Sequence, residues 1–523
     1  MPHGATPRPG SQLPHGTFFP TGMFGRMFPA LPPLSATDDQ LFKLATAMTE
    51  FAPDDPIGDN PGIPAGFTYL GQFIDHDITL DLTPIGRTHV DPMAVRNFRT
   101  PGLDLDCLYG LGPRVNPFMY QRGPDRDRFV IGETSDTPGR GDPSVPVRLP
   151  FDLPRGPDGT ALIGDPRNDE NLVVAQTHLA FLRFHNQVVT ELKAGNIEPI
   201  EPGQVSSFEA ARQLVIWHYH WIVLHDFLRR LIQPSVLDEV LQGGRKFFMY
   251  DREPFMPVEF SGATYRLGHS MVRASYDYNR VFTPKPGGVT PATLELLFLF
   301  SGGSGSVVPI PSDWIIDWRR FHDVDAAVTP GKSRKLDPFV VPPLTDLPEF
   351  RHEPDERLRS LTFRNLKRGV QLGLPSGQWV ARHMGMTPLS PVELSTGRDG
   401  AAARANGFHV QTPLWYYILK EAKVQEDGLR LGQVGSRILA EVFAGLIQGD
   451  PSSFLNIYPH WKPTLPSATR DDFTMADLLN LTGDLNPVGA ELTNGPEPDC
   501  QAPVVNHQPA RRYRAAGGSS GQV

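Results

Sequence analysis

Four polar residues in one short stretch have the types and spacing of a catalytic or metal-binding helix. Tyr69–Thr79 reads Tyr-Leu-Gly-Gln-Phe-Ile-Asp-His-Asp-Ile-Thr. At about 100° per residue, Gln72 and His76 lie on one face of a helix, and Asp75 and Asp77 diverge to either side of it. Buried carboxylates are costly unless they are paired or bind a metal. Such a helix could hold a histidine for acid–base work and a carboxylate for a metal ion.

Apolar residues in the same stretch predict the helix that positions these groups. Phe67, Leu70, Ile74 and Ile78 recur at i, i+3, i+7 and i+11, which is helical spacing with a buried face. A solvent-exposed helix edge with a capping carboxylate would explain the polar residues without any chemistry. Spacing alone leaves both interpretations open.

A second group of oxygen-bearing residues follows in Thr100–Gly110. Thr100, Gly102, Asp104 and Asp106 alternate along this segment, so in an extended loop they face one side. Two carboxylates, a hydroxyl and backbone carbonyls are the hard oxygen ligands that Ca²⁺ takes. Asp-x-Asp also occurs in ordinary turns, so this pattern alone is a weak signal.

A third group lies at the start of a long predicted helix, residues 171–192. Arg167 and Glu170 are three residues apart, which makes them neighbours on one helical face. A simple salt bridge at a helix start would have the same spacing. Asp165 or Asn168 is expected to cap the helix.

Several histidines on predicted helices are poor metal ligands. His218 and His220, in the predicted helix 207–232, are two residues apart. They cannot chelate from one helical face, since zinc-binding helices use an i, i+4 spacing. We interpret both as core or capping residues, and His178 and His185 as structural.

These segments, in this order, resemble those of the animal haem peroxidases. Gly71–Asp77 is similar to the distal-histidine helix of that family, and Gly164–Asn171 to the segment with its distal arginine. Arg266–His269 resembles the segment with the proximal iron ligand, and Leu361–Gly377 the one that supplies that ligand's partner. The resemblance covers about 60–500.

The resemblance implies haem b and Ca²⁺ as cofactors and a role for each candidate residue. The implied residues are His76, Arg167 and Gln72 for catalysis; His269 for the haem iron, Asn365 as its hydrogen-bond partner, and Asp75 and Glu170 for ester links to the haem; and Asp77, Thr100, Gly102, Asp104 and Asp106 for calcium. The family more often has serine where Asp106 stands.

The implied activity is that of a peroxidase. It would reduce hydrogen peroxide and oxidise halides, thiocyanate or phenolic donors through a ferryl-radical intermediate. Some family members form a sulfonium link to the haem from a methionine at the position of Asn171. The asparagine predicts no such link, and bromide, iodide or thiocyanate as better substrates than chloride.

Two other functions stay open. A cyclooxygenase-like fatty-acid dioxygenase would need a radical tyrosine three residues before the proximal histidine, where this chain has Arg266, with Tyr265 one residue further away. Arg140-Gly-Asp142 matches the integrin-binding tripeptide. It would suit a non-catalytic adhesion or interaction protein on a peroxidase scaffold.

Composition excludes several other classes. The 523-residue chain has a net charge of −9 and no basic run, so we expect neither nucleic acid nor anionic membrane as a partner. No apolar run approaches the roughly 20 residues of a membrane span, and residues 1–35 lack the apolar core of a secretory signal. Cys107 and Cys500 are the only cysteines, which argues against a disulfide framework. We expect a cytoplasmic protein, or one secreted by a non-classical route.

The predicted fold is mainly α, a large single domain of the haem-peroxidase type with long ordered loops and little β. This class follows from the resemblance, because periodicity indicates only a large, mostly helical protein. The chain has 54 prolines and 50 glycines, which favours long connections. We expect a Pro/Gly-rich arm over 1–60 with a short helix at 38–49, the peroxidase domain over 61–500, and a flexible tail over 501–523.

Overall fold

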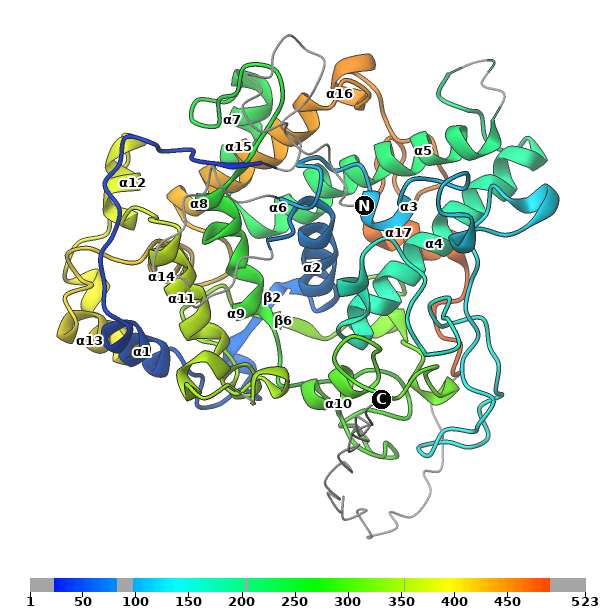
Figure 1. Cartoon of the computed structure of the whole chain (residues 1–523), viewed down its shortest axis with the longest axis horizontal. Coiled ribbons are helices and arrows are strands. Elements are labelled where there is room, and N and C mark those ends of the chain that lie inside the picture. Colours follow the sequence, from blue (N-terminus) through cyan, green and yellow to red (C-terminus); the bar gives the residue numbers. More distant parts are fainter. Residues whose placement is uncertain (1–22, 82–96, 202, 204–205, 352, 490–523) are drawn as a thin grey trace, which may run out of the picture.

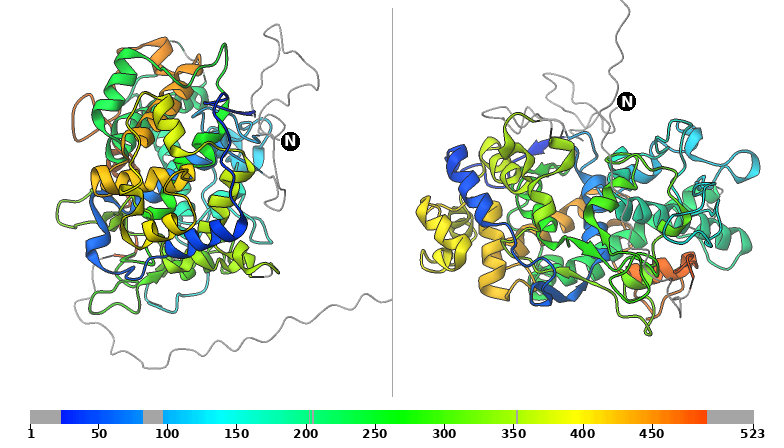
Figure 2. Two further views of the ribbon diagram at one scale, coloured as in Figure 1. Left: turned by 90° about the vertical axis from the view of Figure 1, so that its left-hand side faces the viewer. Right: turned by 90° about the horizontal axis from the view of Figure 1, so that it is seen from below.

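In a computed structural model, which describes residues 23–81, 97–201, 203, 206–351 and 353–489, most of the regular structure is helical. The predicted mainly α class is confirmed. The helices run in several directions and do not form a parallel bundle (Figure 1, Figure 2). They are α1 (Asp38–Ala47), α2 (Gly66–Ile78), α3 (Asp106–Tyr109), α4 (Leu172–Ala194), α5 (Ser207–Trp221), α6 (Leu228–Leu231), α7 (Pro234–Gly243), α8 (Val258–Ser261), α9 (Gly268–Met271), α10 (Leu294–Leu299), α11 (Leu361–Gln371), α12 (Gly377–His383), α13 (Gly397–Ala405), α14 (Leu414–Glu426), α15 (Gln433–Gly449), α16 (Phe454–Ile457) and α17 (Met475–Thr482).

Strands within the described ranges occur only as three short pairs. They are β1 (Phe24–Gly25) parallel to β3 (Met256–Pro257), β2 (Asp59–Pro64) antiparallel to β6 (Lys332–Arg334), and β4 (Ser275–Tyr276) antiparallel to β5 (Ala292–Thr293). The β2–β6 pair leads directly into α2. The sheets therefore tie loops together, and the helices build the core.

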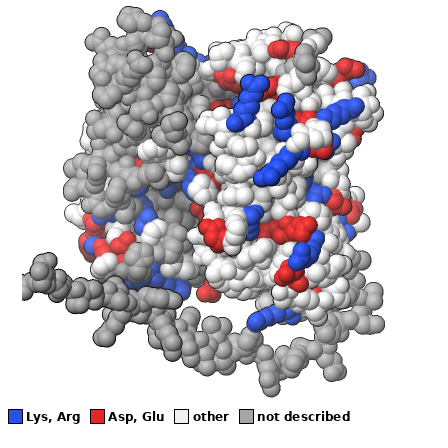
Figure 3. Space-filling view, turned by 45° about the vertical axis from the view of Figure 1, so that its right-hand side comes forward, with Lys and Arg blue, Asp and Glu red and all other residues white. Residues whose placement is uncertain are grey.

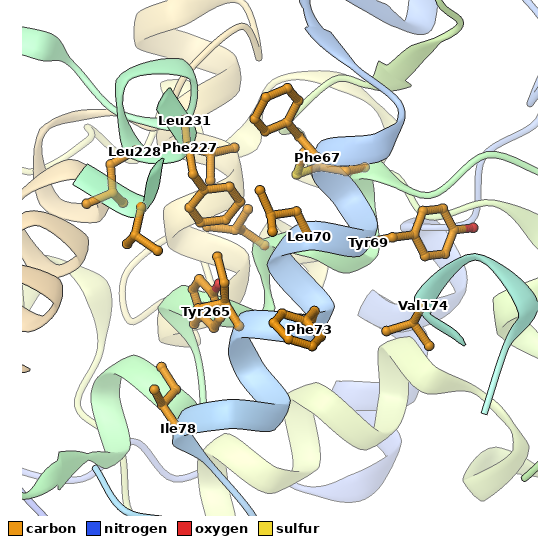
Figure 4. Packing of buried hydrophobic residues seen from close by; sticks show 14 of the residues in the cluster. Phe67, Tyr69, Leu70, Phe73, Ile78, Val174, Phe227, Leu228, Leu231 and Tyr265 are labelled. Carbon is orange, nitrogen blue, oxygen red and sulfur yellow. The ribbon is translucent and has the colours of Figure 1, made fainter. Parts of the chain in front are cut away.

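Helix α2 lies in the middle of the molecule and is buried on most sides (Figure 1). Leu70 and Ile74 are fully buried, as their helical spacing predicts. Phe73, which is not part of that pattern, is fully buried as well. Phe227 and Tyr265 lie beside one side of the helix (Figure 4). Because this position also buries polar residues of α2, their hydrogen-bonding groups must find partners within the protein.

Helix α4 packs against both α2 and α5. Aromatic rings join the three helices: Phe73 stacks on Phe181 at 4.6 Å between ring centroids, and Phe181 meets Tyr219 edge-on at 5.8 Å. On the other side of α2, helix α9 contacts it directly, and α11 and α14 pack against each other. Elements from both halves of the chain therefore surround α2.

The predicted caps of the helix at 171–192 were wrong. Asn171 caps α4 by accepting a hydrogen bond from Val174 N. Asp165 instead caps a separate 3₁₀ turn, Pro166–Asp169. A proline at the first helical position suits such a start, so the chain makes one short turn before α4 begins.

The predicted helix 207–232 is interrupted. Helix α5 passes through a π-helical segment, Ile222–Phe227, into α6. The interpretation of its histidines as core residues is confirmed: His218 Nδ1 lies 2.7 Å from Leu214 O, and His220 Nε2 lies 2.8 Å from Leu103 O.

The described part of the N-terminal arm packs on the rest of the protein. Its short helix is present as α1, and Met27 N and Phe28 N both donate to the buried carboxylate of Glu259. Residues 1–22 and the predicted tail at 501–523 lie outside the described residues.

Two properties of the described structure bear on possible binding partners. In the part of the chain that the structure describes, every helix is too short or too polar to cross a bilayer. On the face drawn in Figure 3, acidic and basic side chains are interspersed.

The start of α2 gives a test of its packing. A Cβ added at Gly66 would lie 2.1 Å from His322 Nε2, and the His322 ring is held by an edge-on contact with Phe67. We expect Gly66→Ala to lower the free energy of unfolding by about 1–3 kcal/mol through overpacking, measured by urea unfolding. Gly243, which ends α7 with no atom within 4 Å of an added Cβ, provides the control. A Gly66→Ala variant as stable as Gly243→Ala would contradict this packing.

Candidate active site

The polar residues of α2 line a cavity of about 370 Å³, a size within the range of ligand sites. The cavity brings together candidate residues from three separate segments. Those that line it are Gln72, Asp75, His76, Arg167, Glu170 and His269. The remaining haem-binding candidate, Asn365, lies behind His269 on α11.

The imidazole of His76 is held by a buried amide. Its Nδ1 lies 2.8 Å from Asn168 Oδ1, and Asn168 Nδ2 lies 3.0 Å from Nδ1 of the buried His178. An amide oxygen only accepts hydrogen bonds, so this network assigns the proton of a neutral His76 to Nδ1. Nε2 then keeps its lone pair, and it lies 3.4 Å from Glu170 Oε1.

Glu170 forms a hydrogen-bonded group with Gln72 and Asn171. Gln72 Nε2 donates to Glu170 Oε1, and Asn171 Nδ2 donates to Gln72 Oε1 at 2.9 Å. Burial disfavours the charged form of Glu170, but His76 and Arg167 outweigh it and hold its pKa below the usual value. The Glu170 carboxylate is therefore ionised at neutral pH, beside the Nε2 face of His76.

Arg167 is fixed at the C-terminal end of α2. Its Nη2 donates to His76 O at 3.0 Å and to Thr79 O at 2.6 Å, and it pairs with Asp165 Oδ2 at 2.7 Å. Asp165 is completely buried. Despite that burial, Arg167 and Arg99 hold the pKa of Asp165 well below its usual range. The Arg167 guanidinium thus has a set position at the cavity wall.

His269 has a neutral imidazole, and a side-chain amide contacts its Nδ1. Burial, and then the charge of Arg266, lower the pKa of His269 to about 3. Its Nδ1 lies 2.7 Å from Asn365 Nδ2, and Asn365 Oδ1 accepts from Arg266 Nη1 at 2.9 Å. A half turn of the amide exchanges its oxygen and nitrogen. Asn365 would then accept from Nδ1–H, and it would give up the hydrogen bond that its oxygen accepts from Arg266 Nη1. A neutral imidazole at a cavity wall is the form that ligates a metal.

The segment that carries His269 is a 3₁₀ turn, Thr264–Leu267, followed by the single turn of α9. Tyr265 also lines the cavity. Its hydroxyl donates to Gly71 O at 3.0 Å, and its ring stacks on Phe260 at 4.9 Å. Both contacts fix the tyrosine beside α2.

The three candidate aspartates for calcium converge. Each of Asp77, Asp104 and Asp106 offers a carboxylate oxygen, and these atoms lie within 4.8 Å of one another. Asp77 Oδ1 and Asp106 Oδ2 are buried and have no hydrogen-bond partner among the described residues. Such a concentration of buried negative charge suits a hard cation.

The loop that brings them together is not extended as predicted. Leu105 has a left-handed φ of 55°, and Asp106 begins α3, so the chain turns between Asp104 and Asp106. Asp106 N donates to Asp104 Oδ1 at 3.1 Å. Thr100 and Gly102 lie in the preceding part of the loop and line a neighbouring pocket with Asp104.

The Arg140-Gly-Asp142 tripeptide does not present its aspartate. Asp142 is buried, pairs with Arg280 Nη1 at 2.6 Å and accepts from Ser144 N at 2.9 Å. These partners hold the pKa of Asp142 below its usual value despite its burial. An adhesive contact would have to break this pairing, so the structure removes the support for that alternative.

Sequence reasoning missed Asn168 as the partner of His76 and missed Arg99 altogether. The sequence indicates Asn168 only as a cap, since its amide approaches His76 only through the 3₁₀ turn. Arg99 is a buried arginine that contacts both Asp106 and Asp165. The available signal was its place beside several acidic residues that need positive charge.

Comparison with known proteins gives one family and a shared fold. Residues 146–451 match the family model for animal haem peroxidase. A peroxidase-like protein of Margaritifera margaritifera is 30% identical over 254 residues, 40% of this chain and 32% of that protein. Chorion peroxidase of Drosophila melanogaster is 28% identical over 301 residues, 55% of this chain and 34% of that protein. The chain thus spans only about a third of the length of these relatives.

Two solved structures share the fold. Peroxidase A of Dictyostelium discoideum superposes with a TM-score of 0.57 at 16% identity, covering 90% of this chain and 94% of that one. A fatty acid alpha-dioxygenase of Oryza sativa superposes with a TM-score of 0.55 at 13% identity, covering 87% and 78%. At these identities the likeness concerns the fold alone.

The aspartate cluster predicts how stability depends on pH. Burial raises the pKa of Asp104 to about 6, and burial with the charge of Asp104 raises that of Asp106 to about 8. The unfolded chain releases these protons near pH 4. Without a bound cation, the contribution of these two carboxyls to the free energy of unfolding should therefore fall between pH 5 and 8, by about 1.4 kcal/mol per unit of pKa shift. Buried histidines such as His178, whose pKa burial lowers to about 3, contribute the opposite slope below about pH 6.5. The contribution of the cluster is therefore measured as a difference between variants.

Urea unfolding in a chelating buffer measures this slope. Asp106→Asn should make the free energy of unfolding fall less, or rise more, from pH 5 to 8 than in the wild type, and Asp158→Asn, which changes an exposed carboxylate, should not. Added Ca²⁺ should shift the pH dependence of the wild type in the same direction, because a cation favours the ionised carboxylates. The same pH dependence in Asp106→Asn and the chelated wild type would refute this account of the cluster.

Proposed function

Because the chain belongs to the animal haem peroxidase family, we propose that it is a haem-dependent peroxidase. It would reduce hydrogen peroxide and oxidise halides, thiocyanate or small phenols. The observation that carries this proposal is that His76 and His269 line one cavity, each with its Nδ1 held by an asparagine amide. The two histidines come from distant parts of the chain, and the fold brings both to a site of ligand size.

The residues fit the cofactor that the family implies. His269 is neutral and can supply a nitrogen ligand to iron, and its Nδ1 partner sets the orientation of the ring. Asp75 and Glu170 line the same cavity and are the candidates for ester links to the haem edge. The haem, when bound, would supply the redox chemistry of its iron.

The chain's own residues would handle the proton and the charge of the peroxide. His76 Nε2 would take the proton from one peroxide oxygen and return it to the other as that oxygen leaves, as a general base and then a general acid. Asn168 keeps the proton of the neutral ring on Nδ1. The Arg167 guanidinium would stabilise the negative charge that grows on the leaving oxygen, and Gln72 would orient water or a halide.

The role of His76 gives a direct prediction. His76→Ala should slow the reaction with hydrogen peroxide by about 10²–10⁴-fold, the usual contribution of a positioned acid–base group. Stopped-flow absorbance measures the rate, and an unchanged Soret band would show that the haem is retained. His383, exposed at the end of α12, provides the control as His383→Ala. Equal peroxide rates in the His76 variant and the wild type would exclude this role.

We also propose that the haem is ester-linked through Asp75 and Glu170. Acid acetone should then extract little haem from the wild type and more from Asp75→Asn or Glu170→Gln. Complete extraction from the wild type would rule the links out.

Asn171 offers no thioether for a sulfonium link, and its amide donates a hydrogen bond to Gln72. Bromide, iodide or thiocyanate should therefore be better substrates than chloride.

We assign Ca²⁺ to the Asp77, Asp104 and Asp106 cluster, with the Thr100 hydroxyl and the Gly102 carbonyl as further ligands. The two unpartnered carboxylate oxygens and the raised pKa values support this assignment. The Ca²⁺ response of the pH-dependent stability tests it. Because Asp77 directly follows His76, a bound cation would also fix this end of α2.

A fatty-acid dioxygenase is the second candidate. The fold shared with the Oryza sativa enzyme and the presence of Tyr265 in the cavity favour it. Against it, the Tyr265 hydroxyl is bonded to Gly71 O, and Arg266 occupies the position three residues before His269. Oxygen uptake with linoleate that Tyr265→Phe abolishes would establish the dioxygenase in place of the peroxidase.

A further inference from the structure

Arg99 joins the aspartate cluster to a carboxylate that belongs to neither proposed site. Its side chain is 2% exposed. Nη1 donates to Asp106 Oδ1 at 3.0 Å, and Nη2 donates to Asp165 Oδ2 and to Gly164 O, the latter at 3.1 Å. One guanidinium is therefore divided between two buried carboxylates.

Asp165 continues this connection to the cavity. The same oxygen that accepts from Arg99, Oδ2, also accepts from Arg167 Nη2 at 2.7 Å, and Oδ1 accepts from Arg167 Nε at 3.1 Å. Arg167 in turn donates to His76 O. An unbroken series of charged side chains thus runs from the cluster to the cavity wall, in the order Asp106, Arg99, Asp165, Arg167.

The charges of this series and of the aspartate cluster do not balance without a cation. The cluster and Asp165 supply four carboxylates, and within the described ranges two guanidiniums, Arg99 and Arg167, form ion pairs with them. One divalent cation would supply the missing charge. In this buried setting the interactions are little screened by salt, so a change at one end alters the balance at the other.

Asp106 is the point where a cation and Arg99 compete. Its Oδ1 is bound to Arg99, whereas its Oδ2 is buried and has no partner in the described structure. A cation bound to Oδ2 would neutralise part of the negative charge of Asp106, so Asp106 would attract Arg99 less strongly. Arg99 would then interact more strongly with Asp165. Asp165 would in turn attract Arg167 less strongly. The positive charge of Arg167 would be less compensated, so Arg167 would stabilise an anion in the cavity more strongly.

We propose that Arg99 is a positioning residue that couples occupancy of the cation site to the strength of Arg167 as an anion-stabilising group. The proposal rests on the haem and calcium sites proposed above. It differs from a purely structural ion pair in one respect. Loss of Arg99 should strengthen cation binding at the cluster and weaken anion binding in the cavity. The charge of Arg99 repels the cation, and its pairing with Asp165 leaves the charge of Arg167 less compensated.

Two affinities of the haem-loaded protein test this coupling. Calcium affinity is measured by calorimetry. Cyanide affinity is measured from the Soret shift, since cyanide is an anion whose binding reports the charge beside the haem. In Arg99→Met we expect Ca²⁺ to bind several-fold more tightly and cyanide about tenfold more weakly, the effect of one lost interaction with a charged group. Chelating Ca²⁺ should weaken cyanide binding in the wild type and leave it unchanged in Arg99→Met.

Two further variants separate coupling from damage. Arg99→Lys keeps the charge but cannot bridge two carboxylates as a guanidinium does, so Ca²⁺ affinity should stay near the wild type while cyanide affinity falls. Arg334, another buried arginine divided between two carboxylates, Glu50 and Asp59, provides the matched control. Arg334→Met should leave both affinities within about twofold, which is under 0.5 kcal/mol.

The outcomes are distinct. Weaker binding of both Ca²⁺ and cyanide in Arg99→Met, or unchanged cyanide affinity in a haem-loaded variant, would overturn the coupling. If Arg99→Met does not fold, a wild-type cyanide affinity in Arg99→Lys would overturn it equally. Absence of a Soret band in the wild type would instead show that the proposed function, on which the coupling rests, is wrong.

Discussion

The structure depends on satisfying the buried polar side chains of α2. Apolar residues drive this helix into the core, and the same burial takes His76 and Asp77 out of water. An unpaired polar group in the interior costs more than a hydrogen bond contributes. Each must therefore meet a partner from another segment: Asn168 in the 3₁₀ turn for His76, and the α3 loop for Asp77. These polar contacts select which elements surround α2, in addition to apolar packing.

The same constraint accounts for the chemistry of the site. Asn168 satisfies one nitrogen of His76 and thereby leaves the other basic. Asp165 satisfies Arg167 and fixes it beside the backbone of α2. Burial keeps His269 neutral, because a buried charge is costly. The neutral imidazole is the form that can bind a metal ion. The arrangement that makes the interior stable thus also prepares a base, a cation and a neutral ligand at one cavity.

Much of this arrangement follows from the sequence. Helical spacing of apolar residues identified α2, α4 and α5, and residue types identified His76, Arg167 and the aspartates as candidates. The assignment of His269 depended on family resemblance, because one histidine after a glycine has no distinctive spacing. The π-helical segment and the 3₁₀ turn before α4 were not predicted, since tertiary packing decides such local departures. Arg99 was missed for a related reason: its partners are 7 and 66 residues away in the chain, and only the fold brings them together.

The central claim is that His76 and His269 serve a single haem site. The absorbance spectrum of the purified protein from about 350 to 700 nm, recorded before and after one equivalent of hydrogen peroxide, tests it most directly, since haem absorption reports its axial ligand and its reaction. The account predicts a Soret band that changes within milliseconds of adding peroxide and recovers when bromide or a phenol is added. A protein with no Soret band after growth with haem, or with one that peroxide does not alter, would contradict it.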